Sequence, residues 1–352
     1  MIDLLALSPD ELTRTLAAQG LPAFRARQLR SWIFEKGALD FDRMSDLPRA
    51  LRDRLAQETT LGTLRAVTEQ RSADGTIKRL YRLHDGHLVE AVLMPYDDGR
   101  RTACISSQAG CAMGCVFCAT GQMGLARNLS TAEILEQAWR FHAELISRGE
   151  RLSNVVLMGM GEPFHNYDGS VGAVRRIIED LGIGQRHITV STVGLVPGIR
   201  RFALEGLQVK LAISLHASTD PERSALLPVN RKWAIEPLIA ACREYQEQTG
   251  RRVTFEWALI RGENDSPEEA HRLGRLLRGL RCHVNLIPLN PTEGYQGTPT
   301  GPADAHGFAA VLEQHGVPAT VRVRRGIDID AGCGQLRDRV LAMQAEDGAD
   351  NR

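Results

Sequence analysis

From about residue 100 onward, short apolar runs alternate with longer stretches in which apolar residues recur at helical spacing. One of these stretches opens with the capping box Ser130-Thr131-Ala132-Glu133 and another with Ser266-Pro267, and both are strong helix-start signals. Strands that alternate with helices predict a parallel sheet, either barrel-like or doubly wound. The strand-like runs are Ala103–Ser106, Val155–Met158, Ile188–Ser191, Val209–Leu215, Val253–Ile260, Val284–Leu289 and Ala319–Val323.

Polar or glycine-containing residues follow the C-terminal ends of several of these runs, at Gly159–Glu162, Ser191, His216 and Asn290. In a barrel the carboxyl ends of the strands converge on one face, where active sites are built. A doubly wound sheet would instead concentrate its ligand at one switch point. Because these polar and glycine residues follow many different strands, the pattern favours the barrel. Six strand–helix units and a closing strand predict an α/β fold, an incomplete (β/α)6 barrel over residues 99–340.

The pattern before residue 99 is different. Residues 1–60 are predicted to form a module of short helices, which opens with the N-cap signal Ser8-Pro9-Asp10-Glu11. Residues 61–98 are predicted to form a small β-meander that links this module to the barrel, with turns at Asp74-Gly75 and Asp85-Gly86. Its expected strands are Leu61–Arg71, Ile77–His84 and Leu88–Met94. The polar residues 341–352 are expected to form a disordered tail.

Composition adds few restrictions. The formal net charge is zero and 43% of residues are hydrophobic, so no global basic field indicates a nucleic-acid partner. A local basic patch could still contact RNA phosphates. The start Met1-Ile2-Asp3-Leu4-Leu5 lacks the features of a signal peptide, and no apolar run has the length of a membrane span. We therefore expect a cytoplasmic protein without a membrane partner.

The seven cysteines are unevenly placed, with four of them between residues 104 and 118. An odd count in a reducing compartment argues against a disulfide scaffold, and the clustering indicates metal or redox chemistry. Cys242 lies in a helical pattern and Cys282 lies just before a strand, so both are interpreted as small apolar core residues.

Cys111, Cys115 and Cys118 form a C-x3-C-x2-C motif in the loop between the first barrel strand and the capped helix. Thiolates are the natural ligands of iron–sulfur clusters, and one loop with this spacing can bind three corners of a [4Fe–4S] cubane. The fourth iron then keeps an open position for a substrate. The alternative is a zinc ion with a fourth ligand from elsewhere in the chain.

The triplet resembles that of the radical S-adenosylmethionine (SAM) superfamily, and Gly159-Met160-Gly161-Glu162-Pro163 stands where that superfamily has a GGEP-like motif. Further motifs are Cys104–Cys111, Arg127-Asn128-Leu129, Met158–Pro163, Ser191–Gly194, Ser214-Leu215-His216, Asn285–Pro288 and Gly326–Leu336. Together they resemble the RlmN/Cfr family of RNA methyltransferases over essentially the whole chain. In that family, RlmN members act on carbon 2 of adenine in 23S rRNA and tRNA, and Cfr members act on carbon 8.

The resemblance implies a two-cysteine mechanism. Taken alone, Cys333 between two glycines could be a turn residue or a fourth cluster ligand, and Cys104 could be a buried strand cysteine. In the family, the residue at Cys333 accepts a methyl group from one SAM, and cleavage of a second SAM gives a 5′-deoxyadenosyl radical that activates this methyl group. The residue at Cys104 resolves the resulting RNA adduct through a disulfide with Cys333. Glu90 matches a proton acceptor.

The resemblance also implies cofactors and partners. One [4Fe–4S] cluster is held by the cysteine triplet, and SAM is the second cofactor. The expected partners are 23S rRNA, tRNA and an external electron donor such as a flavodoxin-type reductant, with the enzyme as a monomer. His216 alone reads more simply as a hydrogen-bonded strand-end histidine. The implied SAM contacts are Gly161, Glu162, Ser191, Ser214, Leu215, His216 and Asn290.

Two departures from the family pattern stand out. The stretch from Glu90 to Cys104 is one residue longer than expected, and Gly332 occupies a position where alanine is expected. Basic residues that could meet RNA phosphates occur in two groups, although each could equally belong to a solvated face. These residues are Arg25, Arg27 and Arg30 in the helical module, and Arg322, Arg324 and Arg325 before Cys333.

Three hypotheses follow. The first is a radical SAM methyltransferase for carbon 2 of adenine in RNA, and the second is a Cfr-type enzyme for carbon 8. Glu162-Pro163 in place of a GEA-like turn favours the first. The third is a zinc-stabilised RNA-binding protein without catalysis.

Overall fold

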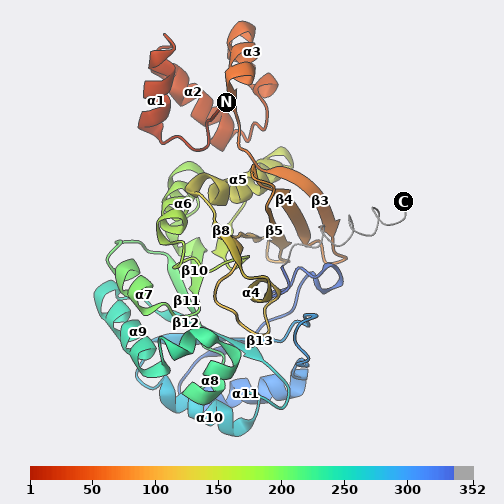
Figure 1. Cartoon of the computed structure of the whole chain (residues 1–352), viewed down its shortest axis with the longest axis vertical. Helices are drawn as coiled ribbons and strands as arrows, with labels where there is room; N and C mark the ends of the chain where they lie inside the picture. The colour runs from red at the N-terminus through yellow and green to blue at the C-terminus, as the bar shows by residue number, and fades with distance from the viewer. Residues whose placement is uncertain (337–352) are drawn as a thin grey trace.

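The computed structural model describes residues 1–336, and within them one ten-stranded sheet organises the molecule (Figure 1). Seven neighbouring strands of this sheet are parallel, as the alternating pattern predicted. Each lies within two residues of its expected bounds at either end. The parallel strands are β6 (Arg101–Cys104), β9 (Asn154–Leu157), β10 (Ile188–Thr192), β11 (Lys210–Ser214), β12 (Val253–Leu259), β13 (Cys282–Pro288) and β14 (Ala319–Val321).

Helices follow the parallel strands in the predicted order and lie around the outside of the sheet (Figure 1). Ser130 and Ser266 cap two of them as expected, each accepting a hydrogen bond from the backbone N–H three residues later. Because β14 is the last strand of an open sheet, the (β/α)6 barrel is incomplete. The helices are α5 (Thr131–Ser147), α6 (Tyr167–Asp180), α7 (Val196–Ala203), α8 (Asp220–Leu226), α9 (Ile235–Thr249), α10 (Pro267–Leu276) and α11 (Pro302–Gln314).

The meander strands β3 (Arg65–Arg71), β4 (Ile77–Arg82) and β5 (Leu88–Pro95) extend the barrel sheet. They are antiparallel to one another, and β5 pairs antiparallel with β6. The meander and the barrel therefore share one continuous sheet. This register brings residues of β5 beside Cys104, which stands opposite Val92.

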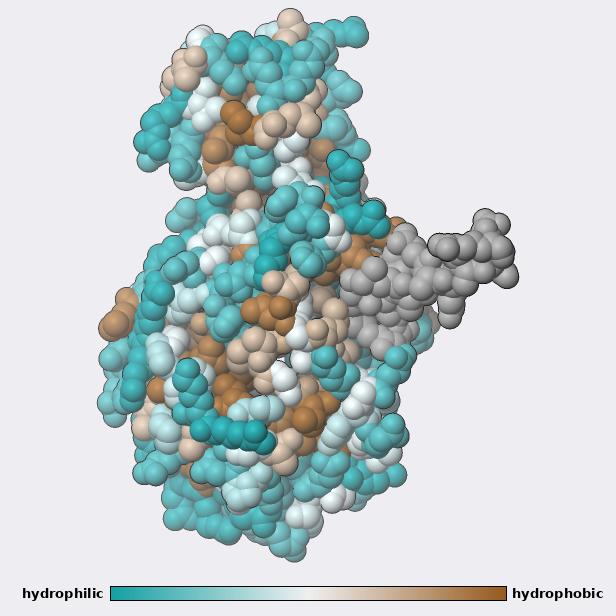
Figure 2. All heavy atoms as spheres, viewed as in Figure 1, coloured by the Kyte–Doolittle hydropathy of each residue, from teal (hydrophilic) through white to brown (hydrophobic). Residues whose placement is uncertain are grey.

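The N-terminal helices pack on α5. Two carbonyls of the π-helical turn η1 (Ser31–Glu35) contact side chains of α5. Trp139 Nε1 donates to the Ile33 carbonyl at 2.8 Å, and His142 Nε2 lies 2.9 Å from the Phe34 carbonyl. Figure 2 shows the helical module joined to the larger body by a narrower waist. The module comprises β1 (Ile2–Asp3), α1 (Pro9–Ala18), α2 (Phe24–Arg30), η1, the 3-10 turn η2 (Phe41–Arg43), α3 (Arg49–Glu58) and β2 (Thr59–Thr60).

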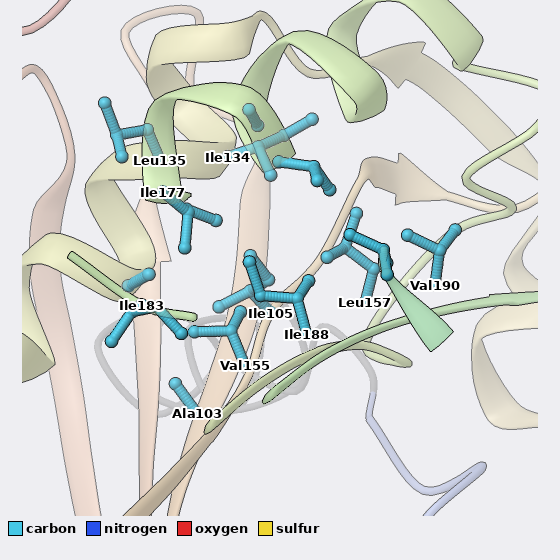
Figure 3. Close-up of a cluster of buried hydrophobic side chains, with 14 of the residues drawn as sticks. Ala103, Ile105, Ile134, Leu135, Val155, Leu157, Ile177, Ile183, Ile188 and Val190 are labelled. Carbon is cyan, nitrogen blue, oxygen red and sulfur yellow. The ribbon is translucent and has the colours of Figure 1, made fainter. Parts of the chain in front are cut away.

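An apolar core fills the space between the first barrel strands and the helices α5 and α6. Ile105, Val155 and Ile188 from the sheet meet Ile134 and Ile177 from the helices, and all five are fully buried (Figure 3). Parallel strands covered by helices read as nearly continuous apolar runs, which explains why the strands were predictable. No helix among residues 1–336 is long and apolar enough to cross a membrane. The predicted disordered tail, residues 341–352, lies outside the described residues.

Candidate active site

The cysteine loop is closed at its base by a short hairpin, β7 (Gln108–Gly110) and β8 (Leu125–Asn128), that was not predicted. The Cys111 N–H donates to the Gly124 carbonyl at 2.8 Å. A Cβ on Gly110 would lie 2.0 Å from that carbonyl oxygen, so only glycine fits there. The helix α4 (Ala119–Met123) follows the third cysteine. Hydrophobic side chains gather around α4 and β8 on the face shown in Figure 2.

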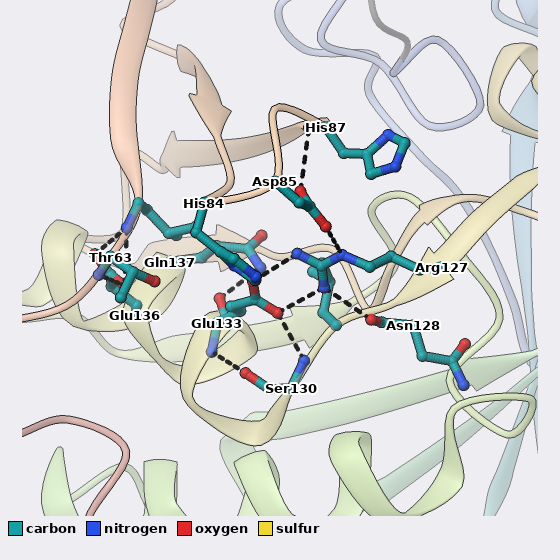
Figure 4. Close-up of polar contacts among 12 residues, drawn as sticks. Thr63, His84, Asp85, His87, Arg127, Asn128, Ser130, Glu133, Glu136 and Gln137 are labelled. Atoms are coloured by element: carbon teal, nitrogen blue, oxygen red, sulfur yellow. Dashed lines mark hydrogen bonds and ion pairs between the residues drawn. The ribbon is translucent and has the colours of Figure 1, made fainter. Parts of the chain in front are cut away.

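Arg127 anchors this hairpin to its surroundings (Figure 4). Its guanidinium donates to both oxygens of Glu133 on α5, at 2.9 and 2.7 Å, and also to Asp85 in the turn between β4 and β5. These carboxylates raise the pKa of Arg127 above its ordinary value through hydrogen bonds and charge. The same Glu133 completes the capping box with Ser130. The Arg127-Asn128-Leu129 motif thus fixes the cysteine loop against α5 and the meander.

The three cysteines fit the chemistry of a cluster. Burial raises the pKa values of all three thiols, that of Cys111 to about 12 and that of Cys115 well above its ordinary value. Neighbouring members of the triplet raise the pKa values of Cys111 and Cys115 further. Such thiols ionise only when a cation compensates the charge, and metal binding then releases their protons. Within residues 1–336, no three His, Cys, Asp or Glu side chains meet around one point as a single metal ion requires.

A cavity of about 1010 Å³, its mouth included, lies beside Cys115 and Cys118 at the carboxyl ends of the strands. It brings together most of the residues that were expected to contact SAM. Leu215 is the exception, since its side chain is fully buried and does not line the cavity. The predicted residues in the cavity wall are Cys115, Cys118, Gly161, Glu162, Ser191, Ser214, His216, Asn290 and Cys333.

Glu162 connects the ends of two strands. Its carboxylate accepts hydrogen bonds from the Phe164 N–H at 2.9 Å and from the Val193 N–H at 2.8 Å. Complete burial nevertheless raises its pKa to about 7. The adjacent Gly161 is needed for packing, because a Cβ there would lie 2.6 Å from Gln108 Cβ. The glycines of this motif thus serve close contact within the protein in this structure.

His216 is held in one tautomer. Its Nδ1 accepts a hydrogen bond from the Ala258 N–H at 2.8 Å, which leaves any ring proton on Nε2. Burial, assisted by the charge of Arg223, lowers its pKa to about 3, so the ring is neutral. The backbone φ of His216 is 62°, a conformation that costs energy in residues other than glycine and that often marks functional sites. A neutral donor therefore faces the cavity.

Asn290 links the cavity to the Cys333 loop. Its Nδ2 donates to the Cys333 carbonyl at 3.0 Å, while its buried Oδ1 has no hydrogen-bond partner within the described residues. An orphaned acceptor in a cavity wall fits a ligand that offers a donor. A Cβ on Gly332 would lie 2.7 Å from Asn290 Nδ2, so the departure from alanine accompanies a tight contact here.

A second cavity, of about 680 Å³ with its mouth included, joins the two catalytic candidates Cys104 and Cys333. Cys333 also lines the first cavity, so it stands in the wall that the two share. Burial raises the pKa of the half-buried Cys104 to about 12, a shift that the nearby Arg322 opposes, whereas the Cys333 residue is exposed at the edge of the cavities. Both residues are free thiols, so the implied disulfide is absent from this state. Glu90 lines neither cavity.

Arg223 on α8 was not recognised in the sequence, where nothing distinguishes it from an exposed helical arginine. It is fully buried, and its guanidinium donates to the carbonyls of Leu215, Val193, Ser214 and Trp233 and to the side chain of Asn230. Burial lowers its pKa to about 10. Because three of these carbonyls belong to the ends of β10 and β11 or to the residues that follow them, Arg223 holds the cavity wall together.

Replacement of Arg223 by methionine should lower the free energy of unfolding by about 3 kcal/mol, because several buried carbonyls would lose their donor. Urea denaturation monitored by circular dichroism would measure the change. Arg243→Met on the exposed side of α9 is the matched control, with an expected change within about 0.5 kcal/mol. Equal stability of the two variants would refute this role.

The fold and the cysteine-flanked cavity define the class, a radical SAM enzyme, and residues 105–274 match the family model of the radical SAM superfamily. Residues 2–61 match the model "Ribosomal RNA large subunit methyltransferase N-terminal domain". The chain is 51% identical over 337 residues to the dual-specificity RNA methyltransferase RlmN 1 of Myxococcus xanthus, covering 95% of this chain and 94% of the relative. It therefore belongs to the RlmN family of radical SAM RNA methyltransferases.

Two further matches agree. A probable dual-specificity RNA methyltransferase RlmN of Moorella thermoacetica is 51% identical, covering 96% of this chain and 97% of the relative. A crystal structure of a radical SAM methyltransferase from Sphaerobacter thermophilus is 50% identical with a TM-score of 0.92, covering 96% of this chain and 99% of that one. The prediction of a radical SAM RNA methyltransferase with a [4Fe–4S] cluster and SAM is confirmed, and the non-catalytic zinc hypothesis was wrong.

Proposed function

We propose that this enzyme methylates carbon 2 of adenine in 23S rRNA and in tRNA, using two molecules of SAM per turnover and an S-methylated Cys333 as intermediate. The position of Cys333 is the observation that carries the proposal, because this thiol lines both cavities. A methyl carrier needs access to a methyl donor on one side and to the acceptor base on the other. Covalent catalysis of this kind divides a difficult transfer into easier steps.

In this proposal the larger cavity binds SAM. The thiols of Cys111, Cys115 and Cys118 hold the [4Fe–4S] cluster, which supplies the electron for radical formation when it is bound. The unpartnered Oδ1 of Asn290 and the neutral ring of His216 offer an acceptor and a donor for the polar groups of SAM. Gly161, Glu162, Ser191 and Ser214 complete the proposed binding set. Leu215 supports this set from behind, since its backbone N–H and carbonyl already bond to Glu256 and Arg223.

The smaller cavity is the proposed entry for the adenine. Arg322 lines it together with Cys104 and Cys333, and the guanidinium carbons of Arg325 and Arg100 lie 4.5 and 4.6 Å from the centroid of the Tyr96 ring. Arginines at a cavity mouth can hold RNA phosphates while a splayed base enters. Arg30, an earlier RNA candidate, instead forms an ion pair with the buried Asp180.

Glu90 is the proposed proton acceptor, and the sheet register supports its assignment. Cys104 stands directly opposite Val92 on the neighbouring strand. Side chains alternate along a strand, so Glu90, two residues before Val92, points to the same face as Cys104. The extra residue relative to the family therefore lies in the turn between β5 and β6 in this interpretation. We further propose a cytoplasmic monomer that receives electrons from a flavodoxin-type reductant.

The charge of Arg325 should matter for all RNA sequences alike. Arg325→Ala is expected to weaken RNA binding and to reduce the slope of log affinity against log salt by about one, because one phosphate contact is lost. Fluorescence anisotropy with a labelled rRNA fragment at several salt concentrations would measure both quantities. Arg243→Ala, which lines neither cavity, should leave them unchanged. An unaltered salt slope in Arg325→Ala would exclude the phosphate contact.

Mass spectrometric mapping of the methylated carbon tests the function itself. The reconstituted enzyme would be incubated anaerobically with SAM, a reductant and either 23S rRNA or tRNA, and the nucleosides then compared with 2-methyladenosine and 8-methyladenosine standards. We expect 2-methyladenosine from both RNAs. Formation of 8-methyladenosine would establish the Cfr-type alternative instead.

A further inference from the structure

The segment that leads to Cys333 is held by the hairpin between β3 and β4. We call this set of contacts, between residues 72–78 and residues 326–330, the hairpin clasp. The contacts are Gly326 N–H to Asp74 Oδ2 at 3.0 Å, Ser72 Oγ to Asp328 Oδ1 at 2.6 Å, Ala73 N–H to Asp328 Oδ2 at 3.2 Å, and Lys78 Nζ to the Asp330 carbonyl at 3.3 Å. Segments more than 250 residues apart in sequence thus meet three residues before the catalytic thiol.

Lys78 is the buried member of the clasp, with 5% of its surface exposed. Its ammonium lies 3.4 Å from Glu90 Oε1 on β5, in addition to its bond to the Asp330 carbonyl. A buried ion pair often stabilises a fold no more than well-packed apolar residues of similar volume would, so stability alone does not account for this pair. A buried lysine that touches both a candidate proton acceptor and the cysteine loop therefore indicates a role in geometry.

We propose that Lys78 is a positioning residue, whose ammonium fixes the Cys333 loop and the Glu90 carboxylate relative to one another. The inference rests on the proposed function, in which Cys333 carries the methyl group and Glu90 accepts a proton. One cation at the junction makes the loop and the carboxylate move as a unit. The meander then serves as a support for the catalytic loop as well as an extension of the sheet.

The test combines amide hydrogen exchange with steady-state kinetics on the full-length, reconstituted enzyme, using a 23S rRNA fragment as substrate. In Lys78→Met we expect faster exchange across residues 326–336 and a kcat at least about tenfold lower, with the KM for RNA within about twofold of wild type. Lys78→Arg keeps a cation at the junction and should recover most of kcat. Lys36→Met is the control, because Lys36 forms a half-exposed ion pair with Asp46. It should change neither the hydrogen exchange across residues 326–336 nor kcat.

Asp328→Asn tests the exposed end of the clasp without removing a buried charge. It should speed exchange in residues 326–330 and reduce kcat less than Lys78→Met does. The proposal is overturned if Lys78→Met exchanges like wild type, if its kcat is unchanged, or if Lys78→Arg is as impaired as Lys78→Met. Failure of the proposed function is distinguishable, because the wild-type enzyme would then form no 2-methyladenosine or carry no methyl group on Cys333, while the exchange rates still report on the clasp.

Discussion

Replacing Cys333 by alanine will abolish methylation of RNA, with a loss of at least about 10³-fold, because the proposed methyl carrier is removed. Among residues 1–336, Cys333 is the cysteine that lines both cavities, since Cys104 lines only the smaller one and Cys115 and Cys118 line only the larger one. Anaerobic turnover with SAM and 23S rRNA, followed by nucleoside mass spectrometry, would measure the loss. Intact-mass analysis of the protein should also show that the methyl group carried by wild type is missing.

Cys282→Ala is the matched control, since this cysteine is buried in the core at the start of β13. It should lower stability slightly and leave the methyl group on Cys333. The iron and sulfide contents of both variants should equal those of wild type, because the cluster is assigned to other cysteines. If Cys333→Ala retains more than about one thousandth of the wild-type RNA methylation, the carrier role is contradicted.

The barrel was predictable because its strands are buried on both faces, so each appears as an apolar run bounded by polar residues. The polar residues after these runs then predicted one shared site, and the cavity collects nearly all of them. Leu215 shows the limit of this reasoning. The motif Ser214-Leu215-His216 predicted three consecutive residues at the SAM site. The middle side chain, Leu215, instead points into the core, where it is fully buried.

Other features depend on long-range register that local patterns do not carry. The meander was assigned as a linker, but the pairing of β5 with β6 makes it part of the barrel sheet. Arg223 and Lys78 look like ordinary surface cations in the sequence, and only the fold buries them. The short strands β7 and β8 were not predicted, because three or four residues are too few to show an alternation of apolar and polar positions. The cysteine spacing indicated the cluster, but the hairpin that shapes its loop did not follow from it.

Replacing Cys104 by alanine should stop the reaction after methyl transfer, so that a covalent protein–RNA adduct accumulates. After methyl transfer, the proposed mechanism leaves the new carbon bonded to both the base and the Cys333 sulfur. The Cys104 thiolate then attacks that sulfur: the S–S bond forms, the S–C bond breaks, and the electron pair left on carbon takes up a proton. Without Cys104 the S–C bond persists.

Denaturing gel electrophoresis with labelled RNA would reveal the adduct, which nuclease digestion and mass spectrometry would assign to Cys333. Cys242→Ala, a buried cysteine on α9, is the control and should turn over without accumulating adduct. Cys104 and Cys333 line the same cavity, and the charge of Arg322 acts on both thiols. Burial raises the pKa of Cys104 to about 12 although the charge of Arg322 opposes the shift, so a base must take the proton of Cys104 before it can act as the resolving thiolate. Clean methylation by Cys104→Ala would therefore exclude its resolving role and leave the adduct to another nucleophile.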